Sequence, residues 1–212
     1  PVYVEADVSN GMPVFEMVGF LASEVKESKE RVRTALKNSG ILLPAKRITI
    51  NFIPANIRKT GSGFDLPIAI AVLAALGLVP QDALENRMII GEISLNGDVK
   101  AVNGILPMVA EARERGITAC IVPQDNGQEA ELVKNMEIYA VHDIKEVLHL
   151  LNGGTFEKKE EKEGEKEPQT GVDFADIQGQ KALKRACEVA VSGMHNLLMV
   201  GPPGAGKTDR KS

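Results

Sequence analysis

Eight residues near the end of the 212-residue chain have the types and spacing of a nucleotide-binding loop. They are Gly201, Pro202, Pro203, Gly204, Ala205, Gly206, Lys207 and Thr208, and they satisfy the phosphate-loop pattern in full. Glycines let a backbone wrap closely around an oxyanion, so that its N–H groups point inward. Lys207 would reach the β- and γ-phosphates of ATP, and the Thr208 hydroxyl would join the ligand shell of Mg²⁺. We therefore expect ATP and Mg²⁺ as the cofactors of this segment.

The residues on either side of this loop fit the same interpretation. The apolar run Asn196–Val200 is typical of the buried strand that precedes such a loop, and a following helix would add its positive end. The acidic strand end and arginine finger that hydrolysis needs do not occur before the polar tail Asp209–Ser212, which we interpret as a truncation or an artificial end. We therefore expect no ATP turnover from these residues alone.

Basic residues on a predicted helix and in a loop are candidates for contact with a nucleic-acid backbone. One stripe along the helix expected over 23–37 consists of Lys26, Lys29, Arg33 and Lys37, and a loop carries Arg58 and Lys59. From these sets, Lys29, Arg33, Arg58 and Lys59 are the possible DNA contacts. The alternative is a solvated helix face, because Glu24, Glu27 and Glu30 balance the charge of the stripe.

The composition argues against several other classes of protein. The net charge is −4, aromatic residues make up 4% and tryptophan is absent, which disfavours a base-stacking platform. Cys120 and Cys187 form no disulfide framework, so a reducing, cytoplasmic location is expected. The three histidines join no cluster with metal-ligand spacing, so we expect no metal except nucleotide-bound Mg²⁺. Neither a membrane span nor a signal peptide is expected.

Strand and helix patterns alternate over residues 1–152 and predict a compact mixed α/β domain. Strands are expected at 2–9, 14–18, 47–52, 88–95, 99–102, 117–122 and 137–141, with a hairpin turn at Asn96-Gly97. Helices are expected at 23–37, 65–76, 105–115, 128–134 and from Asp143 onwards. Asp143 and Glu146 have the spacing of a capping box, and Asp65 is placed to cap its own helix.

A charged segment separates this domain from the nucleotide-binding loop. From Glu157 to Pro168, ten of twelve residues are charged, so the segment cannot bury enough surface to offset its ordering entropy. We interpret residues 153–171 as a solvated linker and residues 172–212 as the beginning of a second domain. There a helix is expected over 180–192, with Leu183, Ala186, Cys187 and Ala190 on its inner face.

Several ordered motifs resemble Mg-chelatase-like AAA+ proteins, and among them the ComM/YifB-type branch most closely. The matching stretches are Val8-Ser-Asn-Gly-Met-Pro13, Val25–Asn38, Pro44–Ile50, Phe64–Ala69, Gly91–Leu95, Phe174–Gln180 and His195–Thr208. The resemblance implies a Lon-protease-like domain of the ChlI type, followed by the start of a hexamer-forming AAA+ motor. It implies that Ile177, Gly179 and Gln180 border the adenine. It also implies that some residues precede Pro1 and that the parent protein drives DNA branch migration in natural transformation.

The Lon-like resemblance raises the question of a peptidase with a serine–lysine dyad. Aligning Lys59-Thr-Gly-Ser-Gly-Phe-Asp65 with the nucleophile loop of that family places Gly63 where the serine should be. Aligning Asn103-Gly-Ile-Leu106 with the lysine segment places Leu106 at the base position, and Ser62 lies one residue away from the nucleophile position. We therefore expect no peptidase activity.

The leading hypothesis from the sequence is an ATP-driven motor that remodels DNA, with the Lon-like domain as a non-catalytic adaptor. The first alternative is a Mg-chelatase-type ATPase subunit, although that subunit normally lacks a Lon-like domain ahead of the motor. An ATP-dependent protease and a purely non-enzymatic interaction scaffold are the further alternatives.

Overall fold

The computed structural model describes residues 1–155, 179, 181–193, 197–198 and 200. Clustering of contacts divides the chain into two units, Pro1–Lys159 and Glu160–Ser212. The proposed linker, residues 153–171, lies mostly outside the described residues, so its boundaries stay a prediction. Each unit is therefore considered by itself.

Three strands form the first sheet of the N-terminal unit: β1 (Tyr3–Ser9), β2 (Val14–Val18) and β3 (Arg47–Ile53). β3 lies in the centre, antiparallel to β1 and parallel to β2. Alternation along β3 buries Ile48, Ile50 and Phe52 and turns the residues between them to the opposite face. The sheet therefore has one face in the core and one largely polar outer face.

The second sheet consists of three parallel strands, β4 (Arg87–Ile89), β7 (Ala119–Pro123) and β8 (Glu137–Val141), with β7 in the centre. A separate antiparallel hairpin, β5 (Glu92–Ile93) with β6 (Val99–Lys100), surrounds the Asn96-Gly97 turn. The hairpin is confirmed. The single strand predicted over 88–95 is wrong, because the run is interrupted at Ile90-Gly91 and its two halves belong to different sheets.

The longer helices of this unit are α1 (Ser23–Asn38), α2 (Asp65–Ala75), α3 (Ile105–Glu114) and α5 (Ile144–Leu151). Short turns complete it: η1 (Asp82–Leu84), η2 (Gln124–Asn126) and α4 (Gly127–Ala130). The helix predicted at 128–134 is therefore shorter and begins one residue earlier than expected. α2 is apolar on nearly every face, and eight of its eleven residues are buried, whereas Ala75 at its end is exposed.

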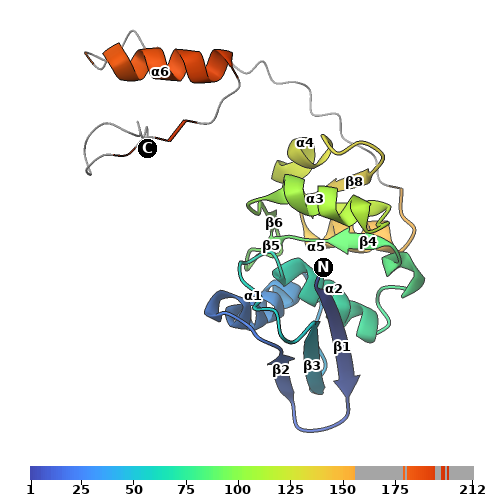
Figure 1. The fold of residues 1–212 in the computed structure, drawn as a ribbon. Coiled ribbons are helices and arrows are strands. Elements are labelled where there is room, and N and C mark those ends of the chain that lie inside the picture. The colour runs from blue at the N-terminus through green and yellow to red at the C-terminus, as the bar shows by residue number, and fades with distance from the viewer. Residues whose placement is uncertain (156–178, 180, 194–196, 199, 201–212) are drawn as a thin grey trace. The chain divides into compact units, whose positions relative to one another are not determined.

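Two apolar clusters hold these layers together. The larger joins α1, α2 and α5 to the first sheet and to Ile121 and Val141 of the second. The smaller joins α3 to the other face of the second sheet, at Cys120 and Val122. Figure 1 shows α3 and α4 on one side of this sheet. The second sheet is thus covered on both faces, as parallel sheets usually are.

The start of α5 shows how local chemistry sets a helix boundary. The Asp143 carboxylate accepts a hydrogen bond from Glu146 N at 2.9 Å, and the Glu146 carboxylate accepts one from His142 N at 2.7 Å. This confirms the predicted pairing. The reciprocal bond goes to the residue before the cap rather than to the cap itself.

In the second unit the structure describes α6 (Lys181–Ser192), which agrees with the helix predicted there. Of the predicted inner face, Ala190 is buried, whereas Ala186 is exposed. The described residues Leu197, Leu198 and Val200 are in no strand, contrary to the prediction for 196–200. A strand requires a hydrogen-bonded neighbour, and no described segment pairs with these residues.

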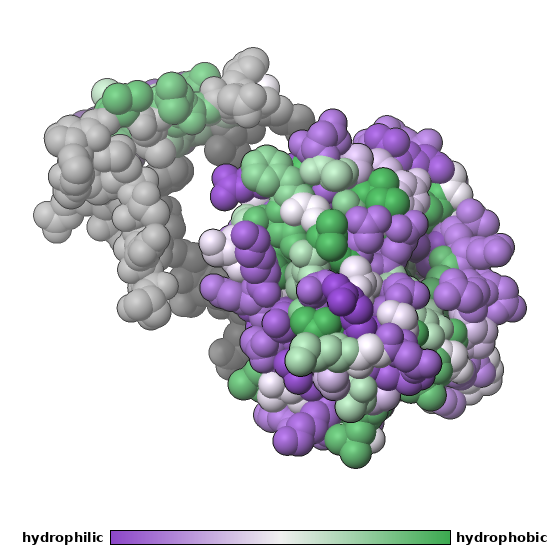
Figure 2. Space-filling model, turned by 90° about the horizontal axis from the view of Figure 1, so that it is seen from below, coloured by the Kyte–Doolittle hydropathy of each residue, from purple (hydrophilic) through white to green (hydrophobic). Residues whose placement is uncertain are grey.

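Within the described residues, every helix is too short or too polar to cross a membrane. On the face shown in Figure 2, hydrophobic residues occur in small groups between hydrophilic ones.

Candidate functional site

The predicted nucleotide site lies almost entirely outside the described residues. This holds for the whole loop Gly201–Thr208 and for Ile177 and Gln180. Gly179 is described, and its φ of 78° places it in the left-handed region, just before α6. The assignment of ATP and Mg²⁺ to these residues stays a prediction.

Residues 59–65, which we aligned with the nucleophile loop of Lon-like peptidases, are described, and apolar groups surround Gly63 within this loop. A Cβ added at Gly63 would lie 3.1 Å from Ile90 Cγ1 and 3.4 Å from Val102 Cγ1. Leu106, at the position aligned with the catalytic lysine, is partly buried against the smaller core cluster. A side chain at Gly63 would therefore meet hydrocarbon of Ile90 and Val102.

Backbone hydrogen bonds attach this loop to the end of β4. Gly91 N donates to Gly63 O at 3.1 Å, Leu66 N donates to Gly91 O at 3.0 Å, and Ile90 N donates to Ile121 O at 3.1 Å. Ile90 follows the last residue of β4, so the loop lies at the carboxyl edge of the second sheet. Ligands bind at this edge in many open α/β sheets. The location is typical of an active site, although the apolar side chains around Gly63 are not.

Asn126 holds Val102 in this arrangement. Its side chain is 6% exposed, its Oδ1 accepts from Val102 N at 2.8 Å, and its Nδ2 donates to Val102 O at 3.0 Å. The amide thus pairs with both polar groups of one residue, as a neighbouring strand would. Nothing in the sequence pattern singled out Asn126, because its partner is 24 positions away.

Asp65 is fully buried and forms an ion pair with Arg31 of α1. Arg31 Nε donates to Asp65 Oδ2 at 2.7 Å and Arg31 Nη2 donates to Oδ1 at 3.0 Å, while Ile93 N donates to Oδ2 at 3.2 Å. The Asp65 carboxylate raises the pKa of Arg31. The prediction that Asp65 caps α2 is wrong, because its oxygens are engaged by Arg31 and Ile93 instead. Asp65 therefore joins α1, α2 and β5 beside the Gly63 loop.

The structure corrects one of the four possible DNA contacts. Lys59 is 1% exposed and its Nζ donates to Pro54 O, so it is unavailable to a phosphate at the surface. Arg58 is exposed. Lys29 and Arg33 are close to Glu30, with N–O distances of 3.9 Å and 4.0 Å. Arg58, Lys29 and Arg33 stay candidates.

Glu24 connects α1 to the same loop. Its Oε1 accepts from Gly61 N at 3.2 Å. Hydrogen bonds from the Glu24 and Gly61 backbone lower the pKa of Glu24, and nearby Arg58 contributes to the same shift. The exposed rim of the loop is thus held by a carboxylate that stays charged at neutral pH.

Other groups with reactive chemistry do not form a site within the described part of the chain. Burial raises the pKa of the Cys120 thiol to about 11, which disfavours the nucleophilic thiolate. No group of three His, Cys, Asp or Glu residues in this part could hold a metal ion.

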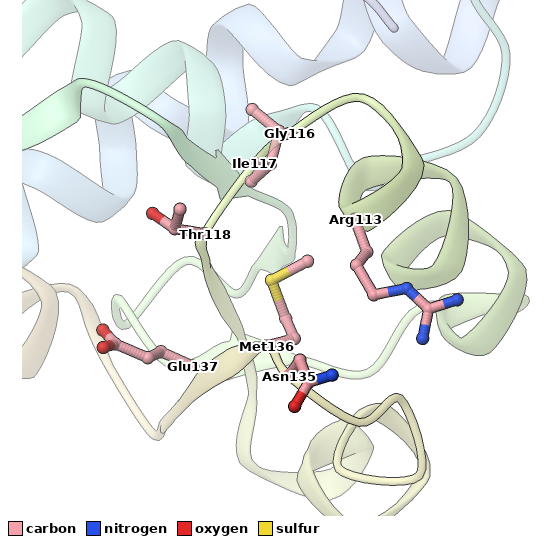
Figure 3. A pocket seen from close by; sticks show the side chains of 7 residues that line it. All are labelled: Arg113, Gly116, Ile117, Thr118, Asn135, Met136 and Glu137. Atoms are coloured by element: carbon pink, nitrogen blue, oxygen red, sulfur yellow. The ribbon is translucent and has the colours of Figure 1, made fainter.

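A surface depression lies at the amino ends of β7 and β8, at the opposite end of the strands from Gly63. Thr118 and Glu137 line it together with Arg113 and Met136. Met136 lies near its centre, and the charged ends of Arg113 and Glu137 point away from one another (Figure 3). Polar groups do not converge there, so we assign it no catalytic role.

Two family models match separate parts of the chain. A family model described as subunit ChlI of Mg-chelatase matches residues 4–126, and a second, described as magnesium chelatase subunit ChlI, matches residues 173–210. The second match includes the complete phosphate loop. The first covers the N-terminal domain up to Asn126.

Curated relatives extend the similarity over nearly the whole chain. Competence protein ComM of Haemophilus influenzae is 38% identical over 212 residues, covering 98% of this chain and 42% of the relative. The uncharacterized protein YifB of Escherichia coli is 38% identical over 208 residues, covering 98% of this chain and 41% of the relative. Lon protease 2 of Bacillus subtilis is 34% identical over 139 residues, which are 64% of this chain and 25% of that protein.

The chain thus spans less than half the length of ComM and YifB. Its N-terminal part is also similar to Lon proteases, which agrees with the mixed α/β fold and the Lon-like character predicted for it. The family models and relatives together show that this chain belongs to the Mg-chelatase ChlI-type family of AAA+ ATPases, with ComM and YifB as relatives.

Proposed function

We propose that the parent protein is an ATP-driven motor and that this chain supplies its N-terminal domain and its phosphate loop. The complete pattern Gly201–Thr208, inside the family match at residues 173–210, carries the proposal. Lys207 would contact the β- and γ-phosphates, and Thr208 would coordinate the Mg²⁺ that accompanies ATP. Ile177, Gly179 and Gln180 would border the adenine.

In this proposal the N-terminal domain is an adaptor and not a peptidase. Similarity to Lon proteases favours a protease, but the apolar packing at Gly63 opposes it. A serine side chain at this position would meet Ile90 and Val102 rather than a desolvated lysine. Ser62 forms no side-chain hydrogen bond to any described residue, so a base that would activate it is not in place among them.

We further propose that the motor acts on DNA as a branch-migration helicase, as a cytoplasmic homo-hexamer. This role follows from the family resemblance in the sequence, and the name of one relative, competence protein ComM, agrees with a function in natural transformation. Arg58, Lys29 and Arg33 are the candidate DNA contacts on the N-terminal domain. The second candidate function is a Mg-chelatase-type ATPase subunit, which the descriptions of both matching family models favour.

The test is ATP hydrolysis by the full-length protein in the presence of branched DNA, a porphyrin or an unfolded protein. We expect branched DNA to stimulate turnover and the other two to leave it unchanged. Lys207→Ala should abolish turnover, since it removes the cation from the phosphates, whereas Lys145→Ala, an exposed lysine on α5, should not. Stimulation by the porphyrin alone would favour the chelatase, and stimulation by unfolded protein with peptide release would favour the protease.

A further inference from the structure

The chain contains five Asn-Gly pairs, which begin at Asn10, Asn96, Asn103, Asn126 and Asn152. Such a pair is prone to deamidation, because glycine has no side chain to shield its own nitrogen. The glycine nitrogen attacks Cγ of the asparagine, the C–N bond of the side-chain amide breaks, and the released NH₂ leaves as ammonia with the proton of the attacking nitrogen. Water then opens the cyclic imide at either carbonyl. The product is aspartate or isoaspartate, and isoaspartate has an extra methylene in the backbone.

The fold holds three of these pairs in hydrogen bonds that the reaction must break. The glycine N–H is already a donor in each: Gly97 N donates to Ser94 O at 2.9 Å, Gly153 N to Leu150 O at 3.2 Å, and Gly127 N to Gln124 O. Two of the asparagine side chains are bound as well. Asn126 pairs with Val102 through both amide atoms, and Asn152 Nδ2 donates to Leu78 O and Leu148 O. Each bond that must open slows the attack by up to about tenfold.

The pair at Asn103 is exposed, but the residues on both sides of it are fixed. Val102 is bound at both N and O by the Asn126 side chain. Gly104 has a φ of 77° and is followed directly by Ile105, the fully buried first residue of α3. Rotation of Asn103 into the geometry of the imide therefore displaces a segment that is anchored at its two ends.

The pair at Asn10 lies in the turn that joins β1 to β2 (Figure 1). All four residues of this turn, residues 10–13, are exposed. Neither the Asn10 side chain nor Gly11 N donates a hydrogen bond to a described residue. The space beside Gly11 is open too, because the nearest atom to an added Cβ would be Arg47 Cβ at 3.8 Å. The attack on Asn10 therefore meets the least resistance from the fold.

We propose that Asn10 is a deamidation site and that the folded chain reacts there first. The reaction adds a negative charge to the turn, since a neutral amide becomes a carboxylate. β1 ends at Ser9 and β2 begins at Val14, and both of these residues pair with Arg47. An extra methylene at Asn10 thus lies outside the paired residues, and the fold should survive it. The reaction needs only water, so the proposal goes beyond the ATP-dependent function proposed above.

The experiment is peptide mapping by mass spectrometry of the 212-residue chain during storage in a mildly alkaline buffer. It follows, at each pair, the mass gain that accompanies replacement of NH₂ by OH. We expect Asn10 to react first, about tenfold or more faster than Asn126 and Asn152. An isoaspartate-specific methyltransferase should then label the peptide that contains residue 10. In guanidinium chloride the five rates should lie within about threefold of one another, since no hydrogen bond of the fold is left to break.

Two variants separate Asn10 from the other pairs. Asn10→Gln should abolish the early mass gain and the methyl label, because attack on the longer side chain requires a less favourable six-membered ring. Asn103→Gln is the matched control at the other exposed pair, and it should leave both signals unchanged. The stored chain should also unfold at the same urea concentration as the fresh chain. An earlier mass gain at any other pair overturns the proposal, as does an order of rates that guanidinium chloride leaves unchanged. A loss of stability on storage that Asn10→Gln prevents overturns it as well.

Discussion

The packing around Gly63 predicts whether a larger residue there stabilises or destabilises the domain. Gly63 is not in the left-handed region, so alanine or serine would suit its backbone. In an open position, Gly→Ala stabilises a protein by about 0.4–1 kcal/mol, because the unfolded chain loses freedom. Here the new Cβ would lie 3.1 Å from Ile90 Cγ1, closer than ordinary contact. We therefore expect Gly63→Ala and Gly63→Ser to destabilise the domain by about 1–3 kcal/mol through overpacking.

The assay is urea unfolding of the 212-residue chain, and truncation of Ile90 supplies the test of mechanism. Ile90→Ala removes the Cγ1 and Cδ1 atoms that crowd the site, at its own cost of about 2–4 kcal/mol. In the double variant the two changes should offset one another by about 1 kcal/mol or more, as expected for residues in contact. Gly61→Ala is the control. Gly61 has φ 87° and no atom within 4 Å of its added Cβ, so its cost is backbone strain that Ile90→Ala does not relieve.

Two results would refute this reasoning. If Gly63→Ala stabilises the domain, the site has room for a side chain. If Gly63→Ser reacts with a serine-directed phosphonate, the position is also accessible and activated. Either result would reopen the question of a peptidase. If the changes in unfolding free energy for Gly63→Ala and Ile90→Ala are additive, the destabilisation by Gly63→Ala does not come from contact with Ile90.

Two further predictions concern the residues that hold this loop. Arg31→Ala should destabilise the domain by about 3 kcal/mol or more in the same unfolding assay, because it leaves the buried Asp65 carboxylate without its cation. Arg33→Ala is the control, since Arg33 is an exposed neighbour, and it should cost less than about 0.5 kcal/mol. Equal losses of stability for the two variants would argue against the ion pair. The lowered pKa of Glu24 means that its contact with Gly61 is present above the ordinary glutamate pKa and is lost as pH falls through the lowered value. The Gly61 amide resonance should therefore titrate below pH 4.5. Glu24→Gln should abolish this transition, whereas Glu85→Gln should not. A transition that persists in Glu24→Gln would assign the titration to another group.

Local patterns predicted the elements whose boundaries depend on nearby residues. Alternation along residues 47–52 identified β3, a strand was also predicted where β8 lies, and the Asp143–Glu146 spacing identified the start of α5. The run 88–95 was predicted as one strand because its apolar pattern does not show which strands it pairs with. Its glycine was the available signal: a Cβ at Gly91 would lie 2.8 Å from Val99 Cγ1.

The roles of charged residues were harder to predict, because they depend on partners distant in the sequence. Asp65 was assigned as a helix cap from its position before an apolar helix, and its partner Arg31 lies 34 residues away. Lys59 was assigned to the surface because most lysines are exposed, yet a carbonyl five residues away accepts its ammonium inside the fold. In both cases the partner, and with it the kind of interaction, was set by the fold.

The N-terminal domain keeps the geometry of a catalytic fold while its central position is filled. The Gly63 loop still meets the carboxyl end of β4, Asp65 still connects three elements there, and Ile90 and Val102 occupy the space between them. We therefore expect no reaction in that space, and the adaptor role proposed above would act through the outer surface of the domain. Substitutions should then separate into two groups. Changes at Gly63 or Asn126 should lower stability, whereas Arg58→Ala should weaken DNA binding by the parent protein while stability is kept.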